Sequence, residues 1–308
     1  MTKPISDPPR PGTPEWRRTV SASKIPAILG LSRWTSQYAI WHEMAGLVEP
    51  APVSEAQADR WQWGHIIEEA LAQHWKAKHP GWSLNPRIRG IAELTYPAVG
   101  LPFPAIATID RRARRGRRFH IIECKLAQDL GDNTESWGRP GEPDSVPADY
   151  FAQVQFQMGV SGIHEASIVV LGAFGNPEIH EIEFDQVLFD GIVDRVAAFM
   201  QSIDAGITPV LDDSLATYET VRGLHPEIDR DKEVTVDMDL ARRIVDVTTT
   251  YAAAEEAMTG LKSEVADLMG EARLLKAGDV KLADRRARGK ARPYVQFAKN
   301  IQLEEETL

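Results

Sequence analysis

The chain contains a single cysteine, Cys124, among its 308 residues. One thiol cannot form an internal disulfide, and it cannot supply a four-thiolate iron–sulfur cluster or a cysteine-rich zinc site. No glycine-rich phosphate loop followed by lysine is present either, which argues against a built-in ATP motor. These absences exclude three common kinds of site and direct attention to the acidic and amide side chains.

Long apolar runs are also missing. No uninterrupted run is long enough to cross a bilayer, and the first twenty residues carry no signal-peptide core. The composition, 43% hydrophobic and 26% charged, is that of a globular chain. We therefore expect a cytosolic protein with no membrane partner, and a length of 308 residues predicts one large domain with an appendage.

The chain lacks an excess of positive charge: 45 Asp and Glu outnumber 35 Lys and Arg, which gives a formal net charge of -10. An acidic chain does not coat nucleic acid nonspecifically, since phosphate binding over a broad face requires an excess of Lys and Arg. Locally the picture is reversed, because six of the eight residues from Arg111 to Arg118 are arginine. This segment is either a solvated hairpin tip or a contact with a DNA backbone, and composition does not separate the two interpretations.

Hydrophobic periodicity predicts alternating helices and strands after a Pro-rich, mobile tail at 1–15. The expected helices are at 21–30, from 35 or 36 to 46, 55–78, from 147 to 159 or 162, and 185–203. The expected strands lie within 83–125 and at 165–172 and 178–184, and a polar loop, functional or disordered, covers 127–146.

The last third of the chain differs in kind. Nine apolar residues alternate steps of four and three without a miss, which is a heptad pattern: Leu240, Ile244, Val247, Tyr251, Ala254, Met258, Leu261, Val265 and Leu268. A coiled-coil arm and one face of a helical hairpin both fit this pattern. A small hairpin (274–283 and 294–298) and an acidic tail follow. The expected division is therefore a tail at 1–15, a main domain at 16–210 and a helical extension at 211–308.

Two carboxylates carry the strongest chemical signal. Asp110 follows the apolar run 106–109, and Glu123-Cys124-Lys125 follows the run 119–122, so we expect two paired strands with the arginine-rich segment as their hairpin tip. Charged groups at the ends of buried strands are costly unless a cation or substrate requires them. A second acid-x-Lys triplet, beginning at Asp279, lies in a turn-like stretch and is the weaker candidate.

These residues support phosphodiester cleavage. Asp110, Glu123 and the backbone carbonyl of Cys124 are suited to hold Mg²⁺, with Mn²⁺ as the alternative ion, and Glu68 can reach the same point from its helix. One or two such ions generate a hydroxide nucleophile and neutralise the pentavalent phosphate. Lys125 would lie on the same side of its strand as Glu123, where it can orient the water.

Other polar residues have two interpretations each. Gln153, Gln155 and Gln157 are either ordinary polar positions of a half-buried helix or donors to the attacking water and the scissile strand. Ser21 and Ser23 are either helix caps or, with Arg17 and Arg18 just upstream, phosphate ligands at a helix N-terminus. Glu68 could likewise be a solvated helix residue.

Taken in order, the motifs resemble the YqaJ-type viral recombinase family, phage exonucleases similar to the lambda exonuclease within the PD-(D/E)XK nuclease superfamily. The motifs are Ser21-Ala22-Ser23 with Ile28-Leu29-Gly30, Trp63-Gly64 with Glu68, Asp110, Glu123-Cys124-Lys125, and Pro147 with the segment 150–155. They span roughly residues 15 to 205.

The resemblance implies a restriction-endonuclease-like α/β core, in which a mixed central sheet is flanked by helices, and Mg²⁺-dependent digestion of duplex DNA from its ends, 5′ to 3′. It also implies a ring-shaped homo-oligomer and a single-strand annealing protein as partner, in the cytosol of a bacterial host. Asp110, Glu123 and Lys125 would be the nuclease triad, Glu68 the helix-borne acid, and Gln153 or Gln155 the glutamine of the family's helix. Ser23, with Arg17 or Arg18, would line a 5′-phosphate pocket.

The heptad-bearing extension departs from the family's compact pattern, so the arm could set a different assembly. Two alternative functions stay open: an endonuclease built on the same core, and a catalytically silent protein that binds DNA ends or organises an assembly through the coiled coil.

Overall fold

The computed structural model describes residues 2–10, 12–49, 54–127, 137–172, 175–298 and 301. The chain forms two compact units, Met1–Ile228 and Asp229–Leu308. Part of the expected loop at 127–146, namely 128–136, lies outside the described residues, as does the acidic tail after 301. In the described parts, no helix is long and apolar enough to cross a membrane.

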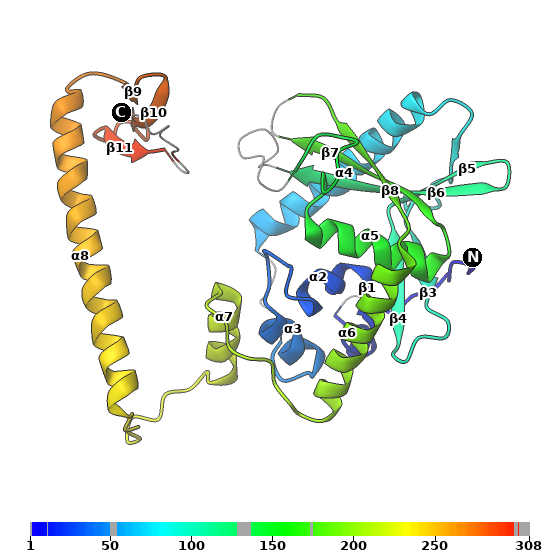
Figure 1. Cartoon of the computed structure of the whole chain (residues 1–308), viewed down its shortest axis with the longest axis horizontal. Helices are drawn as coiled ribbons and strands as arrows, with labels where there is room; N and C mark the ends of the chain where they lie inside the picture. Colours follow the sequence, from blue (N-terminus) through cyan, green and yellow to red (C-terminus); the bar gives the residue numbers. More distant parts are fainter. Residues whose placement is uncertain are drawn as a thin grey trace. The chain divides into compact units, whose positions relative to one another are not determined.

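The first unit is organised by two sheets (Figure 1). A five-stranded sheet has the order β2-β5-β6-β7-β8, in which β6 runs parallel to β7 and the other neighbours are antiparallel. Its strands are β2 (Ser83–Leu84), β5 (Arg111–Arg115), β6 (Arg118–Ala127), β7 (Glu165–Gly172) and β8 (Glu178–Glu183). A second sheet, of order β1-β4-β3, consists of β1 (Val20–Ser21), β4 (Ala105–Ile109) and β3 (Leu94–Pro97).

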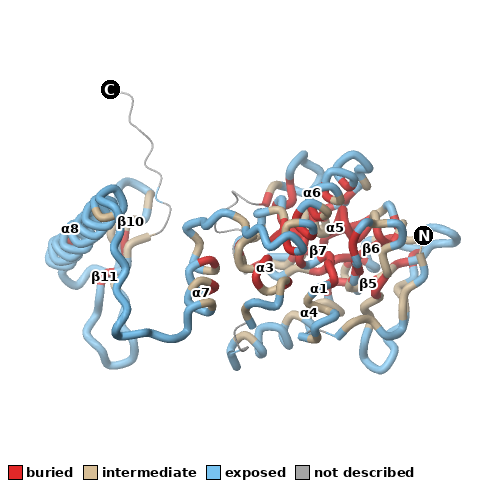
Figure 2. Tube along the Cα trace, turned by 90° about the horizontal axis from the view of Figure 1, so that it is seen from below, coloured by how far each residue is buried: buried red, intermediate tan, exposed pale blue. Residues whose placement is uncertain are grey.

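Helices cover both faces of the larger sheet. On one face α4 (Glu55–Lys78) packs through Leu71 and Trp75 against Ile122 and Cys124 of β6. On the other face α5 (Ala148–Ser161) and α6 (Gln186–Asp204) form the larger core, which Ile121 joins. Successive residues of β6 thus point to opposite faces, as the pleat of a strand dictates. Figure 2 shows the buried residues of this unit concentrated on these elements.

Short helices complete the unit: α1 (Pro14–Arg18), the 3₁₀ turn η1 (Ala22–Lys24), α2 (Ile25–Ile28), α3 (Gln37–Met44) and α7 (Leu215–Leu224). Their ends follow capping rules that the sequence carries. Ser36 accepts a hydrogen bond from the Ala39 N–H and Ser54 accepts one from the Gln57 N–H, while Gly162 ends α5 at a φ of 70°. The predicted α/β class, with a mixed sheet flanked by helices, is confirmed, and so are the predicted helices and strands of the segment 147–203.

One strand assignment was wrong. The runs 106–109 and 119–122 do not pair with each other, because the arginine-rich segment between them is itself the strand β5, whose Arg111 pairs with Ile122 and Arg115 with Arg118. The turn is at Gly116, which has a φ of 62°. Pairs of arginines on either side hid the small residue Ala113, which is fully buried against the α4 face.

Two residues of the segment 1–15, which the sequence predicts to be a mobile tail, form backbone hydrogen bonds with other parts of the first unit. The Thr2 N–H donates to the Ser161 carbonyl over 3.0 Å, and the Ile5 N–H donates to the Thr95 carbonyl over 2.8 Å. At the other end, α7 packs with the first unit, where Thr217 Oγ1 donates to Ser36 Oγ over 2.7 Å. The compact unit therefore extends to Ile228, past the boundary expected after residue 210.

The second unit consists of the long helix α8 (Met238–Met269) and a three-stranded antiparallel sheet of β9 (Leu274–Ala277), β10 (Val280–Arg286) and β11 (Tyr294–Phe297). The predicted long helix and hairpin are confirmed. In α8, all of which is described, the buried residues are Val265 and Met269, which pack on Ala283 and Val295. Most of the heptad positions are exposed, so coiled-coil pairing stays a prediction.

Candidate active site

Asp110 lies at the junction of the two sheets, between β4 and β5. Its Oδ2 accepts a hydrogen bond of 2.7 Å from the Cys124 N–H on β6. The chain crosses from one sheet to the other at Asp110, and this bond holds the crossing point beside the buried part of β6. Asp110 therefore lies close to Glu123 although their strands do not pair.

Glu123 and Lys125 lie on the α5 side of β6. Lys125 Nζ donates to Glu123 Oε1 over 2.7 Å, and Gln153 Nε2 donates to the same oxygen over 2.7 Å. Gln157 Nε2 donates to Glu123 Oε2 over 2.8 Å. A carboxylate has about four lone-pair positions, so three donors leave one of them for a further partner. Glu123 is only 2% exposed, and its orientation is therefore set by the fold.

The charges of this group do not balance. Burial, and then the negative charge of Glu123, raise the pKa of Asp110 well above its usual value, with a smaller contribution from Glu68. Burial alone would lower the pKa of Lys125, but the attraction of Glu123 and Asp110 outweighs it and raises that pKa. Three carboxylates thus face one ammonium, which is the arrangement that a divalent cation would neutralise.

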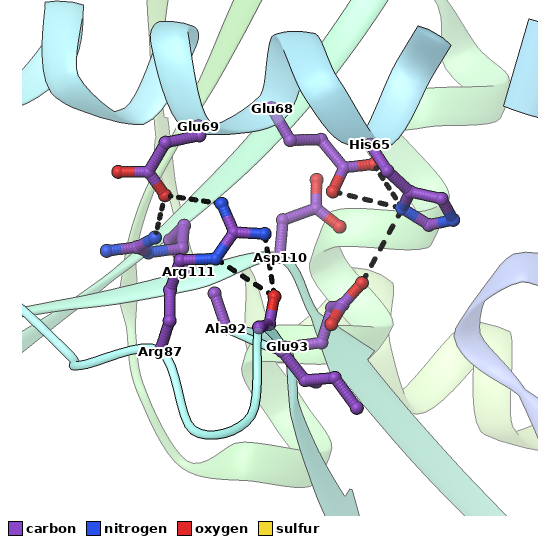
Figure 3. A pocket seen from close by; sticks show the side chains of 10 residues that line it. His65, Glu68, Glu69, Arg87, Ala92, Glu93, Asp110 and Arg111 are labelled. Carbon is purple, nitrogen blue, oxygen red and sulfur yellow. Dashed lines mark hydrogen bonds and ion pairs between the residues drawn. The ribbon is translucent and has the colours of Figure 1, made fainter. Parts of the chain in front are cut away.

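A pocket of about 220 Å³ opens on the α4 side of this group. Figure 3 shows Glu68 and His65 of α4 on one side of it, with Asp110 and Glu93 across from them. His65 Nδ1 lies 3.3 Å from Glu68 Oε1 and 3.7 Å from Glu93 Oε1. One ligand atom of each of these three residues falls within 4.8 Å of the others, as in a metal site, whereas Asp110 and Glu123 are not in that group.

The back wall of the pocket is basic. Arg111, only 4% exposed, pairs with Glu69 of α4 and donates through Nη2 to the Asn85 carbonyl over 3.0 Å. Arg87 reaches Glu69 as well, over 3.2 Å. These contacts hold α4 against β5 and thereby fix the height at which Glu68 faces Asp110 (Figure 3).

Sequence reasoning missed two residues of the pocket, His65 and Glu93. His65 precedes Glu68 by one helical turn, so helix spacing could have found it. Glu93 comes from the loop before β3, and no pattern along the chain links it to α4. The side chain of Cys124 packs on the α4 face with its Sγ 3.5 Å from the Glu68 carbonyl, as befits a small core residue, and burial raises the pKa of the thiol.

Of the three glutamines of α5, Gln153 and Gln157 bind Glu123 and Gln155 does not. Gln155 is fully buried, donates to the Glu183 carbonyl over 2.8 Å and accepts from the Asp185 N–H over 3.0 Å. These bonds join α5 to the end of β8 and to Asp185, and a DNA-binding role for Gln155 stays a prediction. Gln157 is also fully buried and donates to Glu123 and to the Thr108 carbonyl, while its contact with a DNA strand stays a prediction.

The predicted phosphate ligands near the N-terminus are not gathered into one free cationic site. Arg17 forms a two-pronged pair with Glu49, and Arg18 pairs with Asp204 over 2.6 Å. Ser21 and Ser23 contact each other, with 2.9 Å between their hydroxyl oxygens, and Ser21 does not cap η1 with its side chain. Both arginines have acidic partners that compete with a phosphate, so the phosphate role of these four residues stays a prediction.

Residues 14–164 match the model of the YqaJ-like viral recombinase domain. The chain is 27% identical over 257 residues to the uncharacterized protein YqaJ of Bacillus subtilis (strain 168), an alignment that covers 82% of this chain and 74% of that protein.

Similar solved structures include an alkaline exonuclease from Laribacter hongkongensis, at 18% identity and a TM-score of 0.44, over 63% of this chain and 94% of that one. Its complex with dAMP has the same identity and coverage and a TM-score of 0.45. A putative exonuclease from Eubacterium rectale has 11% identity and a TM-score of 0.43, over 74% of this chain and 95% of that one.

Proposed function

We propose that this chain, whose residues 14–164 match the model of the YqaJ-like viral recombinase domain, is a metal-dependent deoxyribonuclease that digests linear duplex DNA from its ends, 5′ to 3′. The observation that carries the proposal is the group of Asp110, Glu123, Lys125 and Gln153 beside an acidic pocket. A protein that only bound DNA would gain nothing from carboxylates clustered where phosphates must approach.

The donor set fits a hard divalent cation, and we propose Mg²⁺, with Mn²⁺ as a substitute. Asp110 and Glu68 offer carboxylate oxygens, Glu123 retains one lone-pair position, and the Cys124 carbonyl is the remaining candidate ligand. When bound, the ion would lower the pKa of a coordinated water and offset the charge of the phosphate. His65 and Glu93 add ligand atoms at the opening of the pocket.

The side chains of the protein would then have separate tasks. Lys125 would hold the attacking water or share the charge of the phosphate through the donors that Glu123 does not use. Gln153 would keep Lys125 and Glu123 together, since its amide contacts both, over 3.4 Å and 2.7 Å. Gln157 would fix the orientation of the Glu123 carboxylate through its hydrogen bond to Oε2. The arrangement places a fixed ammonium next to fixed carboxylates, which is how positioning lowers a barrier.

We also propose that the protein forms a homo-oligomer in the cytosol of a bacterial host, with a single-strand annealing protein as its partner in recombination. The exposed heptad positions of α8 provide the surface for self-association, because a heptad seam is buried only by another helix. A mass measurement of the full chain and of a Leu240→Asp, Val247→Asp variant tests this, and an equal mass for both would contradict it.

The proposed activity is tested by incubating linear and closed circular duplex DNA with the protein. Mg²⁺, Mn²⁺ and excess chelator are compared, with Lys125→Ala as the site variant. We expect loss of linear DNA only, no reaction in chelator, and a rate about 10³-fold lower for Lys125→Ala. Linear DNA labelled at the 5′ or the 3′ end reports the direction of digestion.

Other outcomes identify the alternatives. Loss of circular as well as linear DNA indicates an endonuclease, and retarded but intact DNA indicates a protein that binds ends without cleaving. A Lys125→Ala protein that digests DNA at the normal rate would refute the proposed site.

A further inference from the structure

The hairpin formed by β5 and β6 carries a cluster of arginines that the proposed active site does not use. Arg114, Arg115, Arg117 and Arg118 are all exposed, and no carboxylate lies among residues 111–118. In Figure 1 the hairpin projects beyond the rest of its unit. In a chain with a net charge of -10, such a concentration of positive charge requires an explanation.

Three arginines near the tip of the hairpin differ from the paired arginines of the chain, although Arg111 and Arg118 at the ends of β5 and β6 pair with Glu69 and Glu165. Arg17, Arg18 and Arg222 each have a carboxylate partner. Within the described parts of the chain, Arg114, Arg115 and Arg117 form no ion pair. Their guanidinium donors are therefore available to an anion from outside the first unit.

Aromatic rings support part of this cluster, and one of its arginines, Arg118, also pairs with Glu165 over 2.7 Å. The guanidinium carbons of Arg112 and Arg114 lie 4.9 Å and 5.9 Å from the ring centre of Phe119, and that of Arg118 lies 5.5 Å from the ring centre of Trp82. Arg114 Nε also donates to the Gly116 carbonyl over 2.8 Å. A guanidinium that stacks on a ring is pre-positioned and keeps its outer N–H groups free, which suits bidentate contact with phosphate.

The hairpin starts at the active-site group. Asp110 immediately precedes β5, and Arg111 forms part of the pocket wall. Six residue steps lead from Asp110 to the turn at Gly116, and at about 3.3 Å per step they span about 20 Å, or about six base pairs of duplex DNA. A duplex whose end lies at Asp110 can therefore reach the arginines within less than one helical turn.

We propose that the β5–β6 hairpin is an arm that binds the phosphate backbone of duplex DNA about six base pairs from the active site. This inference rests on the proposed function for its substrate. The arm supplies sequence-independent affinity and holds the duplex while its end occupies the pocket. Contacts of this kind carry a marked salt dependence, which makes them measurable.

The test compares the full chain with Arg114→Gln, Arg115→Gln, Arg117→Gln. A matched control, Arg195→Gln, Arg222→Gln, Arg230→Gln, removes the same number of charges from other elements. All proteins carry Lys125→Ala, so that binding is measured without cleavage. Affinity is measured against salt for a duplex of about 25 base pairs and for a loop-closed duplex of about 5 base pairs, which is too short to reach the arm.

We expect the arm variant to bind the long duplex at least 10-fold more weakly, with the slope of log affinity against log salt smaller by about 2 to 3. Its affinity for the short duplex should match that of the control. An arm variant with the slope and affinity of the control on the long duplex would overturn the proposal and mark the arginines as solvated charges. Cleavage is tested separately, so failure of the nuclease activity does not decide this result.

Discussion

The candidate site has two halves that differ in how they are held. The buried half, on the α5 side of β6, consists of Glu123, Lys125, Gln153 and Gln157, which bind one another through the hydrogen bonds of Glu123. The open half, on the α4 side, consists of His65, Glu68 and Glu93. Its side chains are 66%, 27% and 29% exposed and have few other partners. Asp110 lies between the halves.

This difference indicates a division of labour. The buried half cannot rearrange, because each group that donates to Glu123 comes from a strand or a helix. This half therefore fixes the positions of Glu123 and Lys125. The open half is exposed to solvent, so metal ions, water and substrate can enter the site and products can leave it on this side. Substitutions should therefore affect stability and activity together in the first half, and activity alone in the second.

The largest effect is expected at the junction of the halves. Asp110→Asn keeps an oxygen that can accept from the Cys124 N–H but removes the charge that would bind the cation. We expect nuclease activity to fall at least 10³-fold, and the metal-free protein to become about 1 kcal/mol more stable at pH 8, because a crowded negative charge is gone. Initial rates on linear DNA and urea unfolding in chelator measure the two effects.

The pH dependence distinguishes this explanation from simple repacking. The folded pKa of Asp110 is raised above its unfolded value, so the folded state holds the proton at a pH where the unfolded state has lost it. The stability of the metal-free protein should therefore fall as pH rises from the unfolded to the folded pKa of this carboxyl. The variant should lack that decline, whereas an equal decline in both proteins would contradict the assignment.

A smaller effect is expected in the open half. Glu68→Gln should raise the Mg²⁺ concentration required for half-maximal activity about 100-fold, and Glu93→Gln about 10-fold, while unfolding free energy changes by less than about 0.5 kcal/mol. Glu256→Gln, at an exposed position of α8, is the control and should change neither quantity. A loss of more than about 2 kcal/mol in Glu68→Gln would show that this half is structural as well.

The smallest effect on activity, a loss of about 10-fold, is expected for Gln157→Ala in the buried half. Gln155→Ala, two positions away on α5, is its control. Gln155→Ala and Gln157→Ala each remove a fully buried amide from α5, and both should cost about 1–3 kcal/mol. Only Gln157→Ala releases Glu123, so only this variant should lose activity when both are assayed well below their unfolding temperatures. Equal rates in the two variants would mean that Gln157 is not needed to position Glu123.

Local patterns predicted much of the fold. Apolar periodicity located α3, α4, α5 and α6, because this signal acts within a few turns of one helix. Local residues also mark their starts: α3 and α4 have serine caps, α5 follows Pro147, and α6 is capped by Asp185. The arginine-rich strand β5 was missed for a related reason. Its buried residues are Arg111 and the small Ala113, which give no alternation of large apolar groups, so only pairing with β6 reveals the strand.

The sequence by itself determined the chemistry available to this protein: an acid after one apolar run, an acid and a lysine after another, and amides on a following helix. The tertiary structure decided which of these groups meet. It brought Asp110 to Cys124 across two sheets, turned Gln157 inward to Glu123, committed Gln155 to the core, and added Glu93 to the pocket. Residue spacing along one element is set by backbone geometry, whereas contacts between elements depend on how whole faces pack, and no local pattern records that.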